Sequence, residues 1–198
     1  MVWQVRESIT LRPLSPAHQQ ELWLAVDASR EHLRPWLPWV DATRAPEDIG
    51  SFIQGAQGEH QRGAAWHFAI IDDGEKEGNE VIGACGFNRI SLPHRWASIG
   101  YWLRRDRWGQ GIMLACVRTL LQVGISELNV HRLEIRCAEG NKRSRAIPER
   151  LGFRQEGVLR DCEWVNDQAL SHVVYGLLVS ETSFSAHHHR QRMGNGVQ

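Results

Sequence analysis

A strand-like stretch runs through two glycines into a helix-like stretch over residues 101–116, YWLRRDRWGQGIMLAC. Glycine has no Cβ, so the backbone at Gly109 and Gly111 can lie close to a ligand. The first N–H groups of a helix have no intrahelical partner, and the helix dipole favours an anion there. The segment therefore predicts a diphosphate site at a strand-to-helix turn. Because such turns often use glycine for geometry alone, a purely structural explanation stays open at this point.

The charge balance of the chain limits its partners. Its 23 Lys and Arg residues equal its 23 Asp and Glu residues, so no net basic field argues for nucleic-acid binding.

With 198 residues and 42% apolar content, the chain can form one core. We expect a single domain over residues 1–180. The polar residues 181–198 predict a disordered tail, in which the run His187–His189 is weak evidence for a metal site.

The cysteines indicate a reducing compartment. They are widely spaced, with no C-x-x-C pair and no histidine at ligand spacing, so we expect neither a disulfide framework nor a metal site. The N-terminal segment has no signal-peptide core, and no apolar run approaches the length of about 18 residues that a membrane span requires. These features predict a cytoplasmic protein without a membrane partner. The four cysteines are Cys85, Cys116, Cys137 and Cys162.

The periodicity of apolar residues predicts mixed secondary structure. We expect strands over 4–14, 65–71, 80–89, 96–103, 130–137, 155–164 and 169–179, and helices over 15–29, 45–62, 112–123 and 141–153. In the last helix, Ser144 is the expected N-cap, Pro148 is expected in the first turn, and Gly152 is expected to end the helix. The order of the elements indicates an α+β fold with helices on both faces of a sheet.

Two prolines and two tryptophans stand close together in the segment LRPWLPWV, residues 33–40. The prolines prevent a regular helix, and the tryptophans require burial or a partner. A loop packed on the core explains the segment, and so does one wall of a substrate groove. On the second interpretation, Trp36 and Trp39 line the acceptor groove together with Trp102.

A second motif, NKRSRAIPERLGF over residues 141–153, follows the glycine loop one strand later. Together the two motifs resemble the GNAT superfamily of acyl-CoA-dependent N-acetyltransferases. The resemblance narrows to the RimJ/RimL group, which acetylates protein N-termini including those of ribosomal proteins, and covers roughly residues 5–180. It rests on GYWL at 100–103, GQGIM at 109–113, SRAIPERLGF at 144–153 and LRPWLPW at 33–39.

The resemblance implies a GNAT-like, mostly antiparallel, twisted sheet of about seven strands, and acetyl-CoA as cosubstrate. In this superfamily the strand before the glycine loop splays from its neighbour and pairs with the pantetheine arm, here at Tyr101, Trp102 and Leu103. Asn141 matches an asparagine that contacts the arm, and Ser144 a position near the sulfur. The pyrophosphate would be held by the backbone amides of Gly109, Gln110, Gly111, Ile112, Met113 and Leu114.

The resemblance also implies which groups move protons. Glu163 matches the acidic residue proposed as the base in RimL-like enzymes, although an exposed strand glutamate is the alternative explanation. Many relatives have a tyrosine at the position of Pro148 that protonates the leaving thiolate, and Ser144 takes that role here. Cys137 aligns with a cysteine near the cofactor sulfur, and a buried apolar thiol explains it more simply. The basic residues that flank both motifs, as ligands of CoA phosphates or as solvated loops, are Arg104, Arg105, Arg107, Lys142, Arg143 and Arg145.

These observations predict acetyl transfer from acetyl-CoA to a primary amine by direct attack on the thioester. An α-amine with a pKa of about 7.7 to 8.0 is partly neutral at pH 7, whereas a lysine near 10.4 is almost entirely charged. The expected acceptor is therefore a protein or peptide N-terminus, with a ribosomal protein as one option. The alternatives are a small amine such as an antibiotic or polyamine, a non-catalytic acyl-CoA-binding protein, and nucleic-acid binding through the arginine clusters. A homodimer is expected from the resemblance alone.

Overall fold

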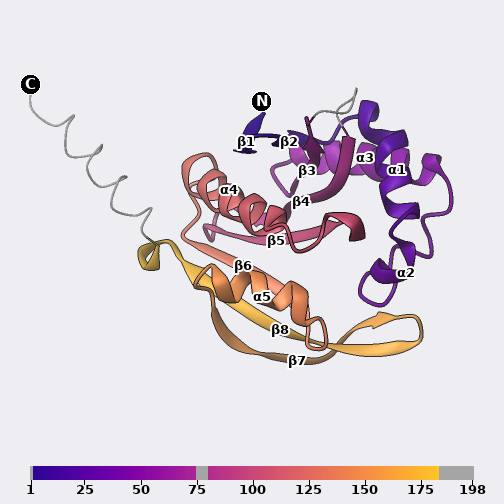
Figure 1. Cartoon of the computed structure of the whole chain (residues 1–198). Coiled ribbons are helices and arrows are strands. Elements are labelled where there is room, and N and C mark those ends of the chain that lie inside the picture. The colour runs from indigo at the N-terminus through magenta and orange to yellow at the C-terminus, as the bar shows by residue number, and fades with distance from the viewer. Residues whose placement is uncertain (1, 75–79, 183–198) are drawn as a thin grey trace, which may run out of the picture.

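One open sheet of eight strands forms the centre of the computed structural model, which describes residues 2–74 and 80–182 (Figure 1). The strand order is β1-β2-β3-β4-β5-β6-β8-β7. All neighbouring strands are antiparallel except β5 and β6, which are parallel. The expected α+β class and mostly antiparallel sheet are confirmed. The strands are β1 (Trp3–Arg6), β2 (Ile9–Pro13), β3 (Trp66–Asp72), β4 (Glu80–Ser91), β5 (Trp96–Leu103), β6 (Arg132–Ala138), β7 (Arg154–Val165) and β8 (Gln168–Leu178).

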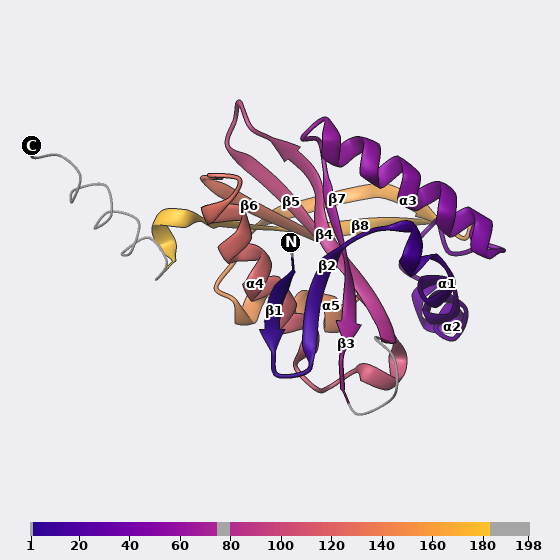
Figure 2. The ribbon, with the colours of Figure 1, turned by 90° about the horizontal axis from the view of Figure 1, so that it is seen from above.

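Helices cover both faces of the sheet, as Figure 2 shows from above. Alternation along β3 explains this, because Phe68 and Ile70 join a core that includes α4, whereas Ala69 and Ile71 pack with α1 and α3. α4 also contacts α5. The helices are α1 (Gln19–Asp27), α2 (Arg30–Leu33), α3 (Pro46–Gln61), α4 (Ile112–Ser126) and α5 (Lys142–Arg150), with single turns η1 (Pro16–His18), η2 (Arg105–Arg107) and η3 (Val179–Glu181).

The N-terminal segment differs from its prediction. The single strand expected over 4–14 is a hairpin of two strands, in which Trp3 pairs with Leu11, and this gives eight strands in place of about seven. The turn at Glu7 and Ser8 contains none of the glycine, proline or asparagine residues that mark most turns. Packing stabilises the extra strand, because the ring of Trp3 lies edge-on to Trp66 with a centroid distance of 5.1 Å.

Helix α5 begins within its predicted range of 141–153, but its N-cap differs from the prediction. The N-cap is Asn141 and not Ser144, since Asn141 Oδ1 accepts a hydrogen bond from the Ser144 N–H at 3.1 Å. Pro148 accordingly lies inside the helix and not in its first turn. Gly152 follows the helix at φ 81°, the left-handed conformation that glycine commonly adopts there, which confirms its predicted role.

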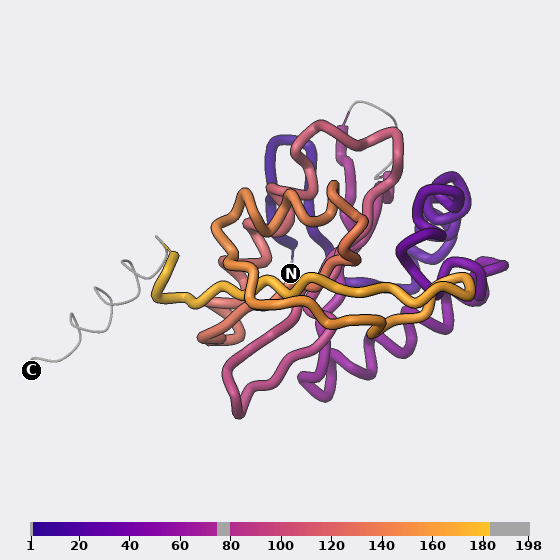
Figure 3. The backbone as a smooth tube through the Cα atoms, turned by 90° about the horizontal axis from the view of Figure 1, so that it is seen from below, coloured from indigo at the N-terminus to yellow at the C-terminus, as the bar shows by residue number. Residues whose placement is uncertain are grey.

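The last two strands form a long hairpin that reaches across the molecule to α2 (Figure 3). Its turn is Asn166-Asp167, as predicted, with φ of 48° and 61°, the signs that a tight hairpin turn requires at both positions. At the tip, Asn166 Nδ2 donates a hydrogen bond to the Arg34 carbonyl at 2.7 Å. This bond fixes the hairpin against the loop that follows α2.

Most of the predicted tail lies outside the described residues, including His187–His189. None of the helices within 2–74 and 80–182 has the length and apolar character needed to cross a membrane. In the same residues, no three His, Cys, Asp or Glu side chains come together as a metal-ligand set.

Candidate functional site

The sheet opens between β5 and β6. These strands pair only from Trp96 to Ile99 on β5, opposite Arg132 to Ile135 on β6. Beyond Ile99, β5 continues to pair with β4 but not with β6, and β6 continues to pair with β8. One side of residues 100–103 on β5 therefore faces an open seam.

The backbone of β5 presents hydrogen-bonding groups to this seam. The Arg104 N–H donates to the Ile82 carbonyl on β4 at 2.9 Å. Because backbone groups alternate sides along a strand, those of Tyr101 and Leu103 point away from β4. The Leu103 carbonyl accepts from Trp108 Nε1 at 3.2 Å and lies 3.3 Å from His32 Nε2. The N–H groups of Tyr101 and Leu103 thus face the seam, where an extended ligand can pair with them.

The glycine loop ends at the seam and forms an anion cradle. Gly109 and Gly111 have φ of 75° and 72°, and a Cβ on either residue would meet no atom of the described residues within 4 Å. Gly111 is the N-cap of α4, and the first helical bond runs from the Ala115 N–H to its carbonyl at 3.1 Å. The amides of Ile112 to Leu114 precede that bond and have no intrahelical acceptor. Several N–H donors thus converge on open space at the positive end of the helix.

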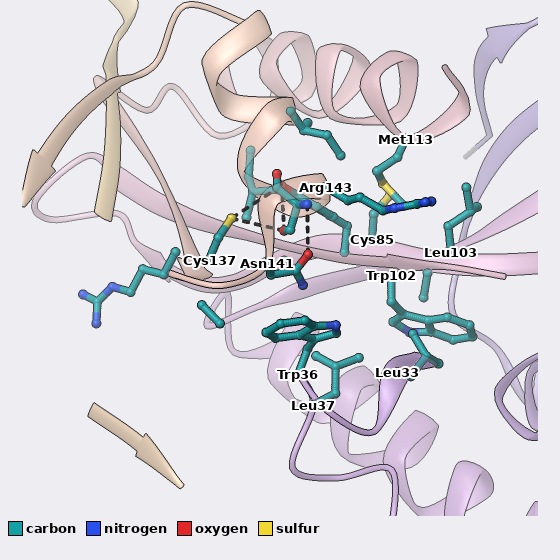
Figure 4. Close-up of a pocket in the computed structure, with 18 of the residues that line it drawn as sticks. Leu33, Trp36, Leu37, Cys85, Trp102, Leu103, Met113, Cys137, Asn141 and Arg143 are labelled. Carbon is teal, nitrogen blue, oxygen red and sulfur yellow. Dashed lines mark hydrogen bonds between the residues drawn. The ribbon is translucent and has the colours of Figure 1, made fainter. Parts of the chain in front are cut away.

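A cavity of about 1360 Å³ joins the cradle, the seam and the other face of the sheet. Figure 4 shows Leu33, Trp36, Leu37 and Trp102 on one side of it and the Cys137 and Asn141 region on the other. The predicted residues that line it are Tyr101, Trp102, Leu103, Gly109, Gly111, Ile112, Met113, Leu114, Asn141, Ser144, Trp36, Trp39 and Glu163.

Gln110 is not part of the cavity wall. Its side chain donates to the Asp106 carbonyl at 3.3 Å, and its own carbonyl accepts from Arg6 Nη1 at 2.9 Å. These bonds hold the residue on the exposed outer side of the loop. Its predicted role rests on its backbone amide, which these two bonds do not engage, so that role stays a prediction.

The tryptophans of the loop after α2 form one wall. Trp36 and Trp39 are half-buried, and the Trp39 ring lies 6.1 Å from that of Trp102 between centroids. The two prolines of the segment explain why no regular helix continues beyond Leu33. The segment therefore contributes to both of its proposed uses, a packed loop and a wall of the cavity.

Tyr101, Cys137 and Ser144 form a polar cluster on the α5 side of the seam. Cys137 Sγ lies 3.1 Å from Ser144 Oγ, and Tyr101 Oη lies 3.4 Å from the same oxygen. Burial raises the pKa of Cys137, so it is a neutral thiol near pH 7, which does not favour a nucleophilic role. Burial, and then the adjacent Cys137, raises the pKa of Tyr101 well above its ordinary value. Both groups keep their protons at neutral pH.

Pro148 explains how this cluster is held. Proline has no N–H, so the Ser144 carbonyl four residues earlier loses its helical partner. Tyr101 Oη donates to that carbonyl at 2.9 Å instead. The carbonyl that Pro148 leaves without a helical partner thus ties α5 to β5 beside Ser144.

We expect Tyr101→Phe to lower the free energy of unfolding by about 1 to 3 kcal/mol, because it leaves the Ser144 carbonyl unpaired. The loss should be smaller in a Pro148→Ala background, where residue 148 regains the N–H that reaches this carbonyl. Denaturant unfolding of the two single variants and the double variant measures the coupling. Equal losses in both backgrounds would contradict this account of Pro148.

Glu163 lies on β7 at the opposite side of the seam from the Ser144 cluster. The residue is half-buried, and its carboxylate Oε2 lies 3.1 Å from His172 Nε2 on β8. No pattern in the sequence pointed to His172, because a single histidine in a strand belongs to no motif. His32 and Trp108 at the Leu103 carbonyl were also missed, because their meeting depends on contacts between segments far apart in the chain.

The flanking arginines divide into engaged and available groups. Arg107 pairs with Asp72 at 3.0 Å and with Glu80 at 2.6 Å, and Arg104 also pairs with Glu80. Burial would raise the pKa of Glu80, but hydrogen bonds from both arginines outweigh it and lower the pKa. Arg143 lines the cavity, as Arg107 does, but its guanidinium lies 4.4 Å from the centre of the Trp108 ring and not in an ion pair with a carboxylate of the described residues. Lys142 and Arg143 are thus better placed for a phosphate than Arg104 and Arg107.

Known proteins share this arrangement. Residues 8–154 match the family described as acetyltransferase (GNAT) domain. The chain is 32% identical over 164 residues to the ribosomal-protein-serine acetyltransferase of Escherichia coli (strain K12), covering 83% of this chain and 89% of that protein.

Two solved structures are similar in fold and sequence. The first is a RimL ribosomal L7/L12 alpha-N-protein acetyltransferase in complex with coenzyme A, with TM-score 0.85, 27% identity, and coverage of 92% of this chain and 100% of that chain. The second is the microcin C7 self-immunity acetyltransferase MccE in complex with acetyl-CoA and AMP, with TM-score 0.81, 28% identity, and coverage of 88% and 94%.

Proposed function

Since the chain belongs to the acetyltransferase (GNAT) family, we propose that it transfers the acetyl group of acetyl-CoA to the N-terminal α-amine of a protein or peptide. The observation that carries the proposal is the open seam beyond Ile99, which connects the anion cradle at Gly111 with the carboxylate of Glu163. A long, thin, anionic cosubstrate fits that path.

The residues present fit acetyl-CoA. The amides of Ile112 to Leu114 receive the diphosphate, and the N–H groups of Tyr101 and Leu103 pair with the pantetheine arm. Lys142 and Arg143 at the cavity wall supply positive charge for the phosphates. Bound acetyl-CoA supplies the thioester whose acetyl group is transferred.

Two side chains transfer the protons of the reaction. Glu163 takes the proton of the acceptor ammonium, directly or through water, so that a neutral amine attacks. Ser144 Oγ lies on the α5 side of the seam, next to Cys137, and donates a proton toward the leaving sulfur. Tyr101 Oη accepts from Ser144 Oγ at 3.4 Å, and burial raises the pKa of Tyr101, so this phenol keeps its own proton. Positioning within the seam and orientation of the amine supply the remaining rate enhancement.

A protein N-terminus is the acceptor we favour, with ribosomal proteins as the first to test. The relative named above acts on a ribosomal-protein serine, and the RimL structure belongs to a protein named for an α-amine. An α-amine also needs less help from a base than a lysine does, because its pKa is about 7.7 to 8.0 against about 10.4. The free thiols and the acceptor both suit the cytoplasm.

The test combines the purified protein, acetyl-CoA and a panel of peptides with free N-termini. We expect CoA release together with a mass gain of one acetyl group on the peptide N-terminus. Peptides with a blocked N-terminus and an internal lysine are the matched controls, and they should stay unmodified. Acetylation of the lysine in these controls would contradict the choice of acceptor.

A small amine is the second candidate, and the likeness to the microcin self-immunity acetyltransferase with bound AMP favours it. Aromatic walls formed by Trp36, Trp39 and Trp102 suit a planar group as well as a peptide. Mass spectrometry with aminoacyl nucleotides, aminoglycosides and polyamines in place of peptides decides between the two.

Binding of acetyl-CoA without turnover on any amine would favour the non-catalytic alternative. Size-exclusion chromatography tests the expected homodimer.

A further inference from the structure

His172 and Glu163 form an incomplete pair inside the cavity. The two atoms His172 Nε2 and Glu163 Oε2 lie 3.1 Å apart, and the His172 side chain is 14% exposed. The ring is not aligned on this oxygen, so Nε2 is a buried polar atom without a hydrogen bond among residues 2–74 and 80–182. A buried group in that state costs about 1 to 3 kcal/mol. Such a cost at a cavity wall indicates a function for the imidazole.

The pairing of β7 with β8 places the carboxylate of Glu163 beside His172. Glu163 pairs with Leu170, so it lies diagonal to His172 on the same face of the sheet. If the pairing continued regularly from the turn, Asp161 would lie directly opposite His172. The register instead shifts between Leu159 and Glu163, and Leu159 takes that place.

Asp161 is held away from the histidine by this bulge. Its φ is 46°, and its N–H donates to Ser171 Oγ at 3.1 Å. Bulges of this kind are frequent beside active sites, where they redirect a side chain. The bulge leaves Glu163 as the carboxylate at ion-pair distance from His172 in the part of the chain that the structure describes.

The pair lies across the sheet from the Ser144 cluster. His172 is paired with Ala138 at the open end of β6, and the neighbouring residue is Cys137, which contacts Ser144. Because successive side chains of a strand point to opposite faces, His172 and Ser144 stand on opposite sides of the seam. A thioester that passes through the seam then has a proton donor on one side and a proton acceptor on the other.

We propose that His172 is a positioning residue: a rotation of its ring turns the 3.1 Å contact of Nε2 with the Glu163 carboxylate into a hydrogen bond, which holds the carboxylate toward the acceptor amine. The inference rests on the proposed function. In the reaction, the acceptor ammonium gives one proton to Glu163, the nitrogen lone pair forms the C–N bond, and the C–S bond breaks. The sulfur takes a proton from Ser144, the nitrogen of the new amide releases its second proton, which restores the Ser144 hydroxyl through water, and Glu163 gives its own proton to water. His172 itself gains no proton.

A charged His172 would oppose this chemistry. A positive imidazole beside Glu163 makes the carboxylate a weaker base, and it repels the acceptor ammonium. Glu134 and Arg136 on β6 compensate each other through a bond of 2.7 Å between Arg136 Nε and Glu134 Oε1. Other charged or titratable groups that line the same cavity include Cys162 on β7, Arg89 on β4, His67 on β3 and His32 on α2.

The first experiment compares His172→Gln with His172→Leu. Glutamine offers an N–H donor and cannot become charged, whereas leucine offers neither donor nor charge. We expect His172→Leu to lose about 10- to 100-fold in kcat with an unchanged Kd for acetyl-CoA. His172→Gln should keep most of the rate at high pH. Circular dichroism and acetyl-CoA binding establish that each variant is folded.

The pH dependence separates positioning from simple packing. The ratio of kcat/KM of His172→Gln to that of the natural protein cancels the titration of the acceptor amine. We expect this ratio to rise as the pH falls, because glutamine cannot become charged. The matched control is His67→Gln, which removes an imidazole from another His–Glu pair, 3.7 Å from Glu59. Its ratio should change less with pH, because burial lowers the pKa of His67 and so favours its neutral ring.

Two results would overturn the proposal. Full activity of His172→Leu at every pH would show that Glu163 needs no partner. Loss of activity in His172→Gln as deep as in Glu163→Gln would make His172 the base itself. An NMR titration is independent of turnover: the ¹⁵N signals of the His172 ring should shift when Glu163 is replaced by Gln. Unchanged signals would end the inference even if no acceptor is found, whereas failure of the proposed function is seen separately as absent CoA release.

Discussion

Replacing Glu163 by Gln should lower kcat with a peptide acceptor by about 10² to 10³ at pH 7, the range typical of a lost general base. Glutamine keeps the size of the side chain but cannot take the proton. The loss should shrink as the pH rises past about 8, because the α-amine then arrives already neutral. Initial rates of CoA release over this pH range measure both effects.

The variant should still bind acetyl-CoA normally, since Glu163 belongs to β7 and the anion cradle to the start of α4. Glu156→Gln is the matched control on the same strand. Glu156 Oε2 accepts from Arg132 at 2.6 Å, so this change should reduce stability and leave turnover intact. A Glu163→Gln protein as active as the natural one at every pH would exclude Glu163 as the base.

Local patterns in the sequence were sufficient for most elements of the fold. The alternation of Leu133, Ile135 and Cys137 predicted β6, and all three side chains are buried in the core shared with α4. The glycines of the cradle were also predicted, because their positive φ is a property of the local backbone. Such features depend on neighbours in the chain and are therefore readable from it.

The features that were missed depend on distant contacts. β1 forms a strand because Trp3 packs on Trp66, which no local pattern contains. The N-cap of α5 was assigned to Ser144 because serine is a good cap, yet Asn141 satisfies the Ser144 N–H with its own side chain. Both errors come from residue preferences that a competing contact overrides.

The seam itself was expected only through resemblance. Periodicity assigns residues 96–103 to a strand but does not say where the pairing with a second strand stops. The pairing of β5 with β6 ends at Ile99, but β5 itself continues to Leu103, and its residues show no pattern that marks where the pairing stops. The position of His172 beside Glu163 is hidden in the same way, because it depends on the bulge between Leu159 and Glu163.

Replacing Gly111 by Ala should raise the Kd for acetyl-CoA at least tenfold, which corresponds to about 1.4 kcal/mol. Gly111 has φ of 72°, and an alanine in that conformation costs about 1 to 2 kcal/mol. The added Cβ also enters the open space in which the amides of α4 converge. Isothermal titration with acetyl-CoA measures the affinity, and thermal unfolding measures the stability.

A matched control separates backbone strain from lost contact with the diphosphate. Gly152 has φ of 81°, and a Cβ there also meets nothing within 4 Å, but the residue lies at the end of α5 and away from the cavity wall. Gly152→Ala should therefore lose a similar amount of stability while keeping its affinity for acetyl-CoA. Stabilisation by saturating acetyl-CoA follows the logarithm of its concentration over Kd, so it should fall for Gly111→Ala alone. Equal affinities in the two variants would show that the cradle at Gly111 does not hold the diphosphate, and the seam would then need another anchor for the cosubstrate.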